Sequence, residues 1–463
     1  MAIRSAAADS IVIENALVRY GDEVRGALAD LGADASPASA FCPGFELPPV
    51  DEPFSRFLAA SELAFVDLGS YRGKRLRLLD LMRNPRTRTT KTVASLVIVA
   101  RAVEYLRRTG EQILLVSPSS GNKVTALRDA VLRAYETGMA TPDQLGIVVV
   151  VPGTSAHKLW HSPLGEDEKL RVRNPIVTFD GVDRADVKKL ARALVDQHGE
   201  ALWAEHGVNL WYTLEIGNYL VADVIRACAE EEFLPRSDGR LHVHAVSSAY
   251  GLLGHNFGAR RLAATRGAQP TAHYFLVQHL DTADMVLSLY FDSVSRTNLP
   301  AYRLDETTGL YRQDESPRFP STTFDLNEVL DPTFYTRQPP TSAEINSIIR
   351  ERGGGGIVVS LHEVLQRYPL LRAMLGPAGI HLPADPRDLR EWSLAMAFTG
   401  ILNAVDRGLV PEEDILVHGS GSYQAADFVP IPVDRLHPVD DVDGLLRITL
   451  RAASAGAVLP ASR

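Results

Sequence analysis

The chain has 463 residues, of which 45% are hydrophobic and 23% charged, and its formal net charge is −9. A single hydrophobic core stops growing at about 250–300 residues, so two lobes or one domain with large insertions are expected. The negative charge argues against general binding to nucleic acids or anionic membranes, and no apolar run approaches the ~18 residues of a membrane span.

The N-terminal segment becomes charged before an apolar signal core can form, so the sequence predicts no secretory signal. The chain has two cysteines, Cys42 and Cys228. They are too few to cross-link a protein of this size, and they have no Cys-x-x-Cys spacing. We therefore expect free thiols, a cytoplasmic location and no metal site.

Apolar, strand-like runs alternate with segments of helical periodicity, which is typical of parallel α/β folds. In the clearest unit, apolar residues recur at helical spacing over 93–106 and a strand is predicted at 113–116. The turn 117–122 opens a second helix, and a second strand covers 147–151. Loops that follow such strands are where α/β folds bind ligands.

Three segments interrupt this alternation and are predicted to be connections or lids. They are the proline-rich residues 43–53, the Pro-, Thr- and Asp-rich residues 312–340, and the glycines 353–356.

Three motifs carry chemistry. Residues 84–91, Asn-Pro-Arg-Thr-Arg-Thr-Thr-Lys, put Lys91 at the start of a helix, although a lone lysine there would normally be solvated. Residues 119–122, Ser-Ser-Gly-Asn, form a turn whose amides open a helix and can hold an anion. Residues 251–258, Gly-Leu-Leu-Gly-His-Asn-Phe-Gly, permit close backbone approach to a phosphate or simply form a tight strand-to-helix turn.

In this order, the motifs resemble those of the fold-type II pyridoxal 5′-phosphate (PLP) enzymes, the family of threonine synthase, cysteine synthase, the serine/threonine dehydratases and the tryptophan synthase β subunit. Residues 150–159, 214–222 and 415–421 are similar to further family segments. The resemblance implies a homodimer of two-lobed α/β subunits, with mostly parallel sheets and helices on both faces. A small mobile lobe would comprise 92–205, and a large PLP-binding lobe 1–91 and 206–463, with an insertion around 290–356.

The resemblance also implies a role for each motif residue. Lys91 would carry PLP as a Schiff base and, once freed, act as the general base, while Asn122 would donate to the 3′-oxygen of the ring. The pyridine nitrogen would face either Ser420 or His418, and both alternatives stay open. The phosphate would bind the backbone of Gly251, Leu252, Leu253, Gly254 and His255. The substrate would contact Thr90, Ser119, Ser120 and Gly121.

The expected reaction is removal of the α-proton of an amino acid, followed by elimination or replacement of a β or γ substituent such as an acylated or phosphorylated hydroxyl, in specialised metabolism. Leu252, Leu253 and His255 depart from the small or hydroxyl residues of the family loop, so a non-catalytic binding or regulatory protein of this fold is an alternative. A nucleotide-binding, doubly wound enzyme is another, although it would need an early Gly-x-Gly-x-x-Gly turn that the sequence lacks.

The arginines around Lys91 would receive an anionic leaving group or form a solvated loop: Arg83, Arg86 and Arg88.

Overall fold

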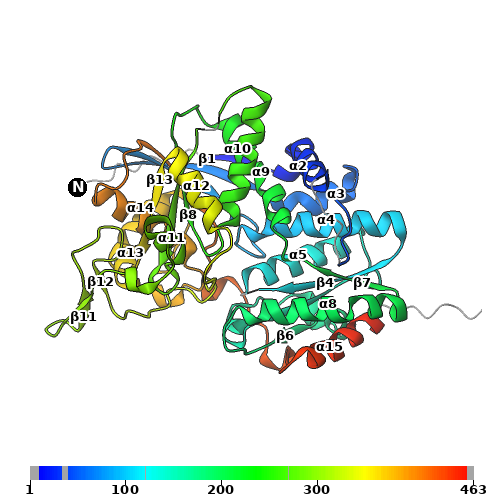
Figure 1. Cartoon of the computed structure of the whole chain (residues 1–463). Coiled ribbons are helices and arrows are strands. Elements are labelled where there is room, and N and C mark those ends of the chain that lie inside the picture. The colour runs from blue at the N-terminus through cyan, green and yellow to red at the C-terminus, as the bar shows by residue number, and fades with distance from the viewer. Residues whose placement is uncertain (1–9, 34–39, 120, 270, 456–463) are drawn as a thin grey trace, which may run out of the picture.

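The computed structural model describes residues 10–33, 40–119, 121–269 and 271–455. Two sheets, each covered by helices, lie side by side and give the molecule two lobes (Figure 1). The predicted α/β class with mostly parallel sheets is confirmed. Over the described ranges, no helix is both long enough and apolar enough to cross a membrane.

The larger sheet has the strand order β1-β2-β3-β14-β8-β9-β13. Its strands from β3 to β13 run parallel, and β1 and β2 extend it in antiparallel fashion. The parallel strands are rich in apolar residues because helices cover both faces. Their bounds are β1 Ser10–Ile13, β2 Leu63–Tyr71, β3 Lys74–Asp80, β8 Leu241–Ala245, β9 His273–His279, β13 Gly354–Val359 and β14 Asp414–Gly419.

Two groups of helices cover this sheet. One face packs against α13 (Leu361–Leu375) and α14 (Ser393–Asp406). The other face packs against α9 (Ile216–Phe233), α10 (Tyr250–Thr265), α11 (Asp284–Phe291) and α12 (Ser342–Arg352). Residues on alternate positions of each strand therefore meet different helices.

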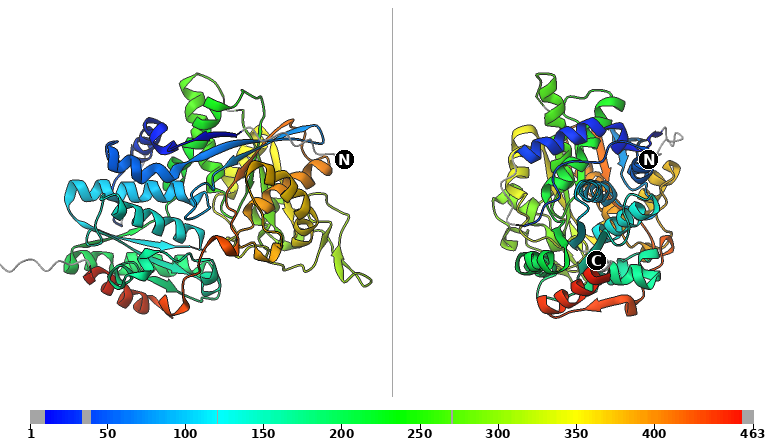
Figure 2. Two further views of the ribbon diagram at one scale, coloured as in Figure 1. Left: turned by 180° about the vertical axis from the view of Figure 1, so that it is seen from behind. Right: turned by 90° about the vertical axis from the view of Figure 1, so that its right-hand side faces the viewer.

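The smaller sheet is parallel throughout, with the order β15-β6-β5-β4-β7. Helices α4 (Lys91–Thr109) and α5 (Asn122–Glu136) cover one face, and α8 (Asp186–His206) and α15 (Val442–Ala455) the other. Figure 2 shows α15 and the end of the described chain against this lobe. The strands are β4 Gln112–Pro118, β5 Leu145–Val151, β6 Ile176–Thr178, β7 Val208–Tyr212 and β15 Leu436–Pro438.

The small lobe was predicted to comprise 92–205. The smaller sheet also contains β7 and β15, and α15 packs on it, and these three elements lie outside that range. The helix expected from Lys91 and the strands expected at 113–116 and 147–151 are present as α4, β4 and β5. Whether the two lobes move as units stays a prediction.

The glycines at 353–356 were predicted to be a connection, and this prediction is wrong. Gly354 to Gly356 begin β13, which pairs with β9 inside the larger sheet. A Cβ atom on Gly354, whose φ is 108°, would lie 2.0 Å from the carbonyl oxygen of Tyr274. Gly354 is therefore required by the close approach of two strands.

Much of residues 292–341, which lie within the range predicted to be an insertion, follows no regular structure. The segment carries a small three-stranded sheet at its tip, formed by β10 (Arg303–Asp305), β11 (Leu310–Arg312) and β12 (Thr322–Thr323).

Candidate active site

A pocket lies between the two sheets, where segments that follow β4, β8 and β14 come together with the start of α4. This is the edge at which parallel α/β folds bind ligands. The structure brings seven predicted site residues into this pocket: Thr90, Lys91, Ser119, Asn122, Gly251, Leu252 and Ser420.

Lys91 begins α4, and it lines the pocket. Its Nζ atom lies 5.5 Å from the centre of the Tyr219 ring. Burial of the ammonium group lowers the pKa of Lys91; the charge of Asp223 opposes this shift and that of Arg226 reinforces it. The environment therefore favours the neutral amine, which is the nucleophilic and basic form.

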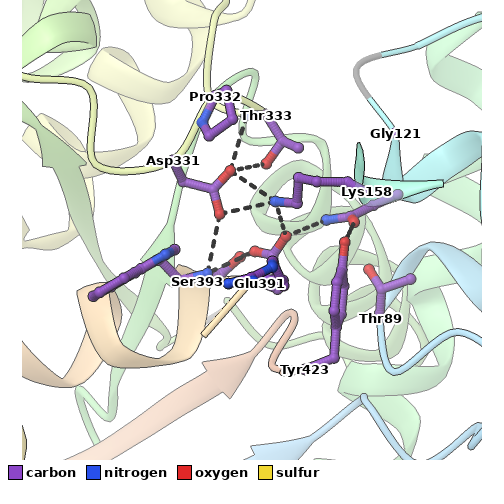
Figure 3. A network of polar contacts seen from close by, with 12 residues as sticks. Thr89, Gly121, Lys158, Asp331, Pro332, Thr333, Glu391, Ser393 and Tyr423 are labelled. Atoms are coloured by element: carbon purple, nitrogen blue, oxygen red, sulfur yellow. Dashed lines mark hydrogen bonds and ion pairs between the residues drawn. The ribbon is translucent and has the colours of Figure 1, made fainter. Parts of the chain in front are cut away.

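Asn122, the first residue of α5, is held at both ends of its side-chain amide. Its Nδ2 donates to Glu391 Oε2 at 2.6 Å, and Tyr423 Oη donates to its Oδ1 at 2.8 Å. Figure 3 labels Glu391 and Tyr423, the two partners of this amide. Because an amide nitrogen carries two hydrogens, one donor of Asn122 remains for a ligand.

Glu391, which accepts the hydrogen bond from Asn122, belongs to a buried ion cluster (Figure 3). Lys158 Nζ lies 2.9 Å from Asp331 Oδ1 and 3.1 Å from Glu391 Oε2, and none of the three side chains is exposed to solvent. The Asp331 carboxylate also accepts hydrogen bonds from the amides of Thr333 (2.9 Å) and Trp392 (3.0 Å). The cluster therefore joins the lobe that carries Asn122 to the insertion and to the segment before α14.

The glycines of the motif 251–258 lie within α10 and not in a loop. A Cβ atom on Gly254 would lie 2.4 Å from Cβ of Asp223, and one on Gly258 would lie 3.0 Å from Cβ of Ala227. These glycines therefore allow α9 and α10 to pack closely. Leu253, Gly254 and His255 are buried and do not line the pocket.

The beginning of α10 offers backbone amides to the pocket. The loop that joins β8 to this helix, including Ser247 and Ser248, lines the pocket together with Tyr250 and Gly251. The amides of Leu252 and Leu253 donate to the carbonyl of Ala249. Within the described residues, the amides of Tyr250 and Gly251 have no such partner, which leaves two donors at a helix N-terminus.

Ser420 and His418 occupy different environments. Ser420 Oγ is buried, lines the pocket and has no hydrogen-bonding partner in the described part of the chain. His418 lies below the pocket, where its Nε2 is 3.1 Å from His242 Nδ1 and its ring stacks on that of His244 at 4.0 Å. Of the two alternatives, Ser420 lines the pocket and His418 does not.

The predicted substrate residues are placed less uniformly. Thr90 Oγ1 accepts a hydrogen bond of 2.8 Å from Arg226, and Ser119 Oγ accepts one of 3.3 Å from the amide of Gly121. Gly121 adopts a φ of 139° just before α5 but does not line the pocket. Ser120 lies outside the described residues.

Several residues of the pocket were missed in the sequence. The buried Arg226 hydrogen-bonds Asp223 and Thr90. Its position three residues after Asp223, in the otherwise apolar stretch 220–229 of α9, was a signal that could have found it. Lys123 is also buried in the pocket; burial and the charge of Lys91 lower its pKa to about 7. Lys188 and the insertion residues 333–336 complete this side, and no local pattern marked them.

The three arginines that precede Lys91 do not line the pocket. Each is paired with acidic residues: Arg83 with Glu62 and Asp80, Arg86 with Asp129 and Glu136, and Arg88 with Asp427. The structure therefore offers no support for their role as a leaving-group site.

The sequence was compared with known proteins and structures. Residues 12–453 match a family described as a family of unknown function, DUF6002. No curated protein matches the sequence. The fold is similar to that of PLP-bound threonine synthase from Brucella melitensis, with 12% identity, 94% of this chain and 89% of that chain covered, and a TM-score of 0.52. Serine racemase from maize gives 12% identity, coverages of 87% and 94%, and a TM-score of 0.46.

At these identities the likeness establishes the fold, whereas the family match spans almost the whole chain. The chain therefore belongs to the family of unknown function DUF6002, and its fold is that of the fold-type II PLP enzymes.

Proposed function

We propose that the protein binds PLP in this pocket through Lys91 and removes the α-proton of an amino acid, so that a β or γ substituent is eliminated or replaced. The observation that carries the proposal is the joint placement of Lys91 and the unpaired Ser420 hydroxyl around one pocket. The similarity of the fold to that of PLP-bound threonine synthase supports a PLP-dependent reaction of an amino acid.

The polar groups of the pocket suit PLP. The free amides at Tyr250 and Gly251 would bind its phosphate, and the remaining Nδ2 hydrogen of Asn122 would donate to its phenolic oxygen. The Ser420 hydroxyl would meet the pyridine nitrogen, which a neutral partner leaves unprotonated. Because His418 and residues 253–255 lie outside the pocket, we do not assign them to the cofactor.

PLP supplies an electron sink that stabilises negative charge on the α-carbon of an amino acid. The lowered pKa of Lys91 allows its amine to be neutral, as both attack on a carbonyl and removal of a proton require. An unprotonated pyridine nitrogen withdraws electrons less strongly, which favours loss of a leaving group over transamination. Thr90 and Ser119 would contact the substrate from the two sides of the pocket.

We expect covalent attachment of PLP to Lys91. Borohydride reduction and peptide mass mapping should place the pyridoxyl group on Lys91, and the Lys91→Ala variant should lose the visible absorption band of lysine-bound PLP. Its rate of substrate turnover should fall by about 10²–10⁴, the usual contribution of a general base.

Lys123→Met is the matched control, because Lys123 lines the same pocket, and this variant should still be labelled at Lys91. A label on Lys123 or Lys188 in the wild-type protein would contradict the assignment. The reaction is tested with amino acids that carry an acylated or phosphorylated hydroxyl, by measuring release of the leaving group. Formation of pyridoxamine phosphate with a keto acid would reject the reaction type, and absence of any spectral response would favour the non-catalytic alternative.

A further inference from the structure

A group of histidines lies in the core of the larger lobe, beneath the pocket. His242 and His244 alternate along β8 and therefore point to one face of the sheet, and His418 of β14 is the register partner of His244. His255 reaches the same place from α10, and its ring centre lies 4.2 Å from that of His242. All four side chains are buried, so their polar atoms need specific partners.

In His242 and in His255, the Nδ1 atom already has a hydrogen-bonding partner. His242 Nδ1 lies 3.1 Å from His418 Nε2, and His255 Nδ1 lies 2.8 Å from the hydroxyl of Tyr274. The Nε2 atoms of both rings are directed to Glu230 of α9. His255 Nε2 is 2.8 Å from Glu230 Oε2, whereas His242 Nε2 is 3.4 Å from Glu230 Oε1 and forms no hydrogen bond within the described residues.

We propose that His242, His255 and Glu230 bind a divalent transition-metal ion of the Zn²⁺ class. Ligand atoms of His242, His255 and His418 all lie within 4.8 Å of one another, and the Glu230 carboxylate adjoins two of these rings. With bonds of ~2.0–2.1 Å, two ligands of a tetrahedral ion lie about 3.4 Å apart, which matches the separation of His242 Nε2 and Glu230 Oε1. Imidazole and carboxylate together suit Zn²⁺, Fe²⁺ or Co²⁺ better than Mg²⁺ or Ca²⁺.

The outer contacts fit this interpretation. A histidine ligand usually has its second nitrogen held by another group, as His418 and Tyr274 hold His242 and His255 here. Arg240 donates to Glu230 Oε1 at 2.5 Å, and its charge is offset by Asp414 at 2.9 Å. The bound ion would replace the hydrogen bond between His255 and Glu230.

The ion would reach its ligands from solvent through a cavity separate from the pocket of Lys91. A second cavity is lined by Glu230, His242 and His255 and shares no lining residue with the pocket of Lys91. The Glu230 side chain is 16% exposed, so the site is reachable from solvent. His418 lies between the proposed ion and Arg226, at 3.4 Å from the arginine. The ion would therefore stabilise the wall of the pocket without contacting substrate. These ligands come from α9, β8 and α10, so they show no local spacing in the sequence.

The test uses the full chain, stripped with a chelator and titrated with Co²⁺ by visible absorption and with Zn²⁺ by calorimetry. One ion per chain should bind, and Zn²⁺ should raise the thermal unfolding midpoint. Glu230→Gln and His255→Gln should weaken binding more than about 100-fold, and Tyr274→Phe, which removes an outer partner, by about 10-fold.

His273→Gln is the control, because His273 pairs with Glu412 at 2.8 Å in a part-exposed site and should not contribute. Lys91→Ala should bind the ion like the wild type, so the result does not depend on the proposed function. Glu230→Gln keeps the shape of the side chain, and it decides the outcome if His255→Gln does not fold. The proposal is overturned if no ion binds, if Glu230→Gln binds like the wild type, or if Mg²⁺ competes equally.

Discussion

Lys158→Met should destabilise the protein by about 3–5 kcal/mol, because it leaves two buried carboxylates without their cation. Burial alone would lower the pKa of Lys158, but the charges of Asp331 and Glu391 raise it well above its usual value. The ammonium group is therefore charged at neutral pH, and its loss is not relieved by solvent. The measurement is the free energy of unfolding from urea titration.

Lys189→Met is the matched control, because Lys189 pairs with Asp186 at 2.7 Å while 82% of its side chain is exposed. This variant should have nearly wild-type stability, since solvent screens the pair. Adding Glu391→Gln to Lys158→Met should recover part of the lost stability, because it removes one of the unbalanced charges. Equal stability of the two lysine variants would contradict the importance of the buried cluster.

Gly254→Ala should lower the free energy of unfolding by about 1–3 kcal/mol, although alanine is intrinsically the better helix former. The added methyl group would lie 2.4 Å from Cβ of Asp223 and 3.0 Å from the carbonyl oxygen of Tyr219. The backbone of α9 cannot move aside like a flexible side chain, so the two helices must separate. The start of α10, which borders the pocket, should shift with them, and PLP binding should weaken.

Gly199→Ala provides the control, because Gly199 lies inside α8 and the nearest atom to an added Cβ is 4.0 Å away. This substitution should raise stability by about 0.5–1 kcal/mol through the lower entropy cost of alanine. Opposite signs for the two glycine variants would establish helix packing as the cause. A stabilising effect of Gly254→Ala would show that α9 and α10 are not held as closely as described.

The local parts of the fold were predictable from the sequence. The helix that begins at Lys91 and the strands β4 and β5 follow from apolar periodicity, which depends on neighbouring residues only. The strand that begins at Gly354 was missed because glycine normally marks a turn. Glycine is needed at this position because the carbonyl of Tyr274, on another strand, leaves no room for a side chain. The residues next to Gly354 in the sequence do not indicate this contact.

The pocket was predictable to the extent that its motifs resemble a known family. The structure places Lys91, Asn122 and Ser420, which the resemblance singled out, around one pocket. The resemblance could not supply the partners of Asn122, since Glu391 lies 269 residues away along the chain. It also assigned Gly254 to a phosphate loop, because the pattern of glycines alone does not separate a loop from a tightly packed helix pair.

The position of β15 and α15 has a consequence for the newly synthesised chain. A ribosome releases residues 176–178 long before residues 436–455, yet β15 is the outer neighbour of β6 and α15 covers apolar residues of the smaller sheet. Until residues 436–455 have been synthesised, that sheet presents an unpaired edge and an uncovered apolar surface, which are the features that promote aggregation of nascent proteins. Neither sheet can therefore be completed before the late strands have been synthesised, because β14 is likewise an inner strand of the larger sheet.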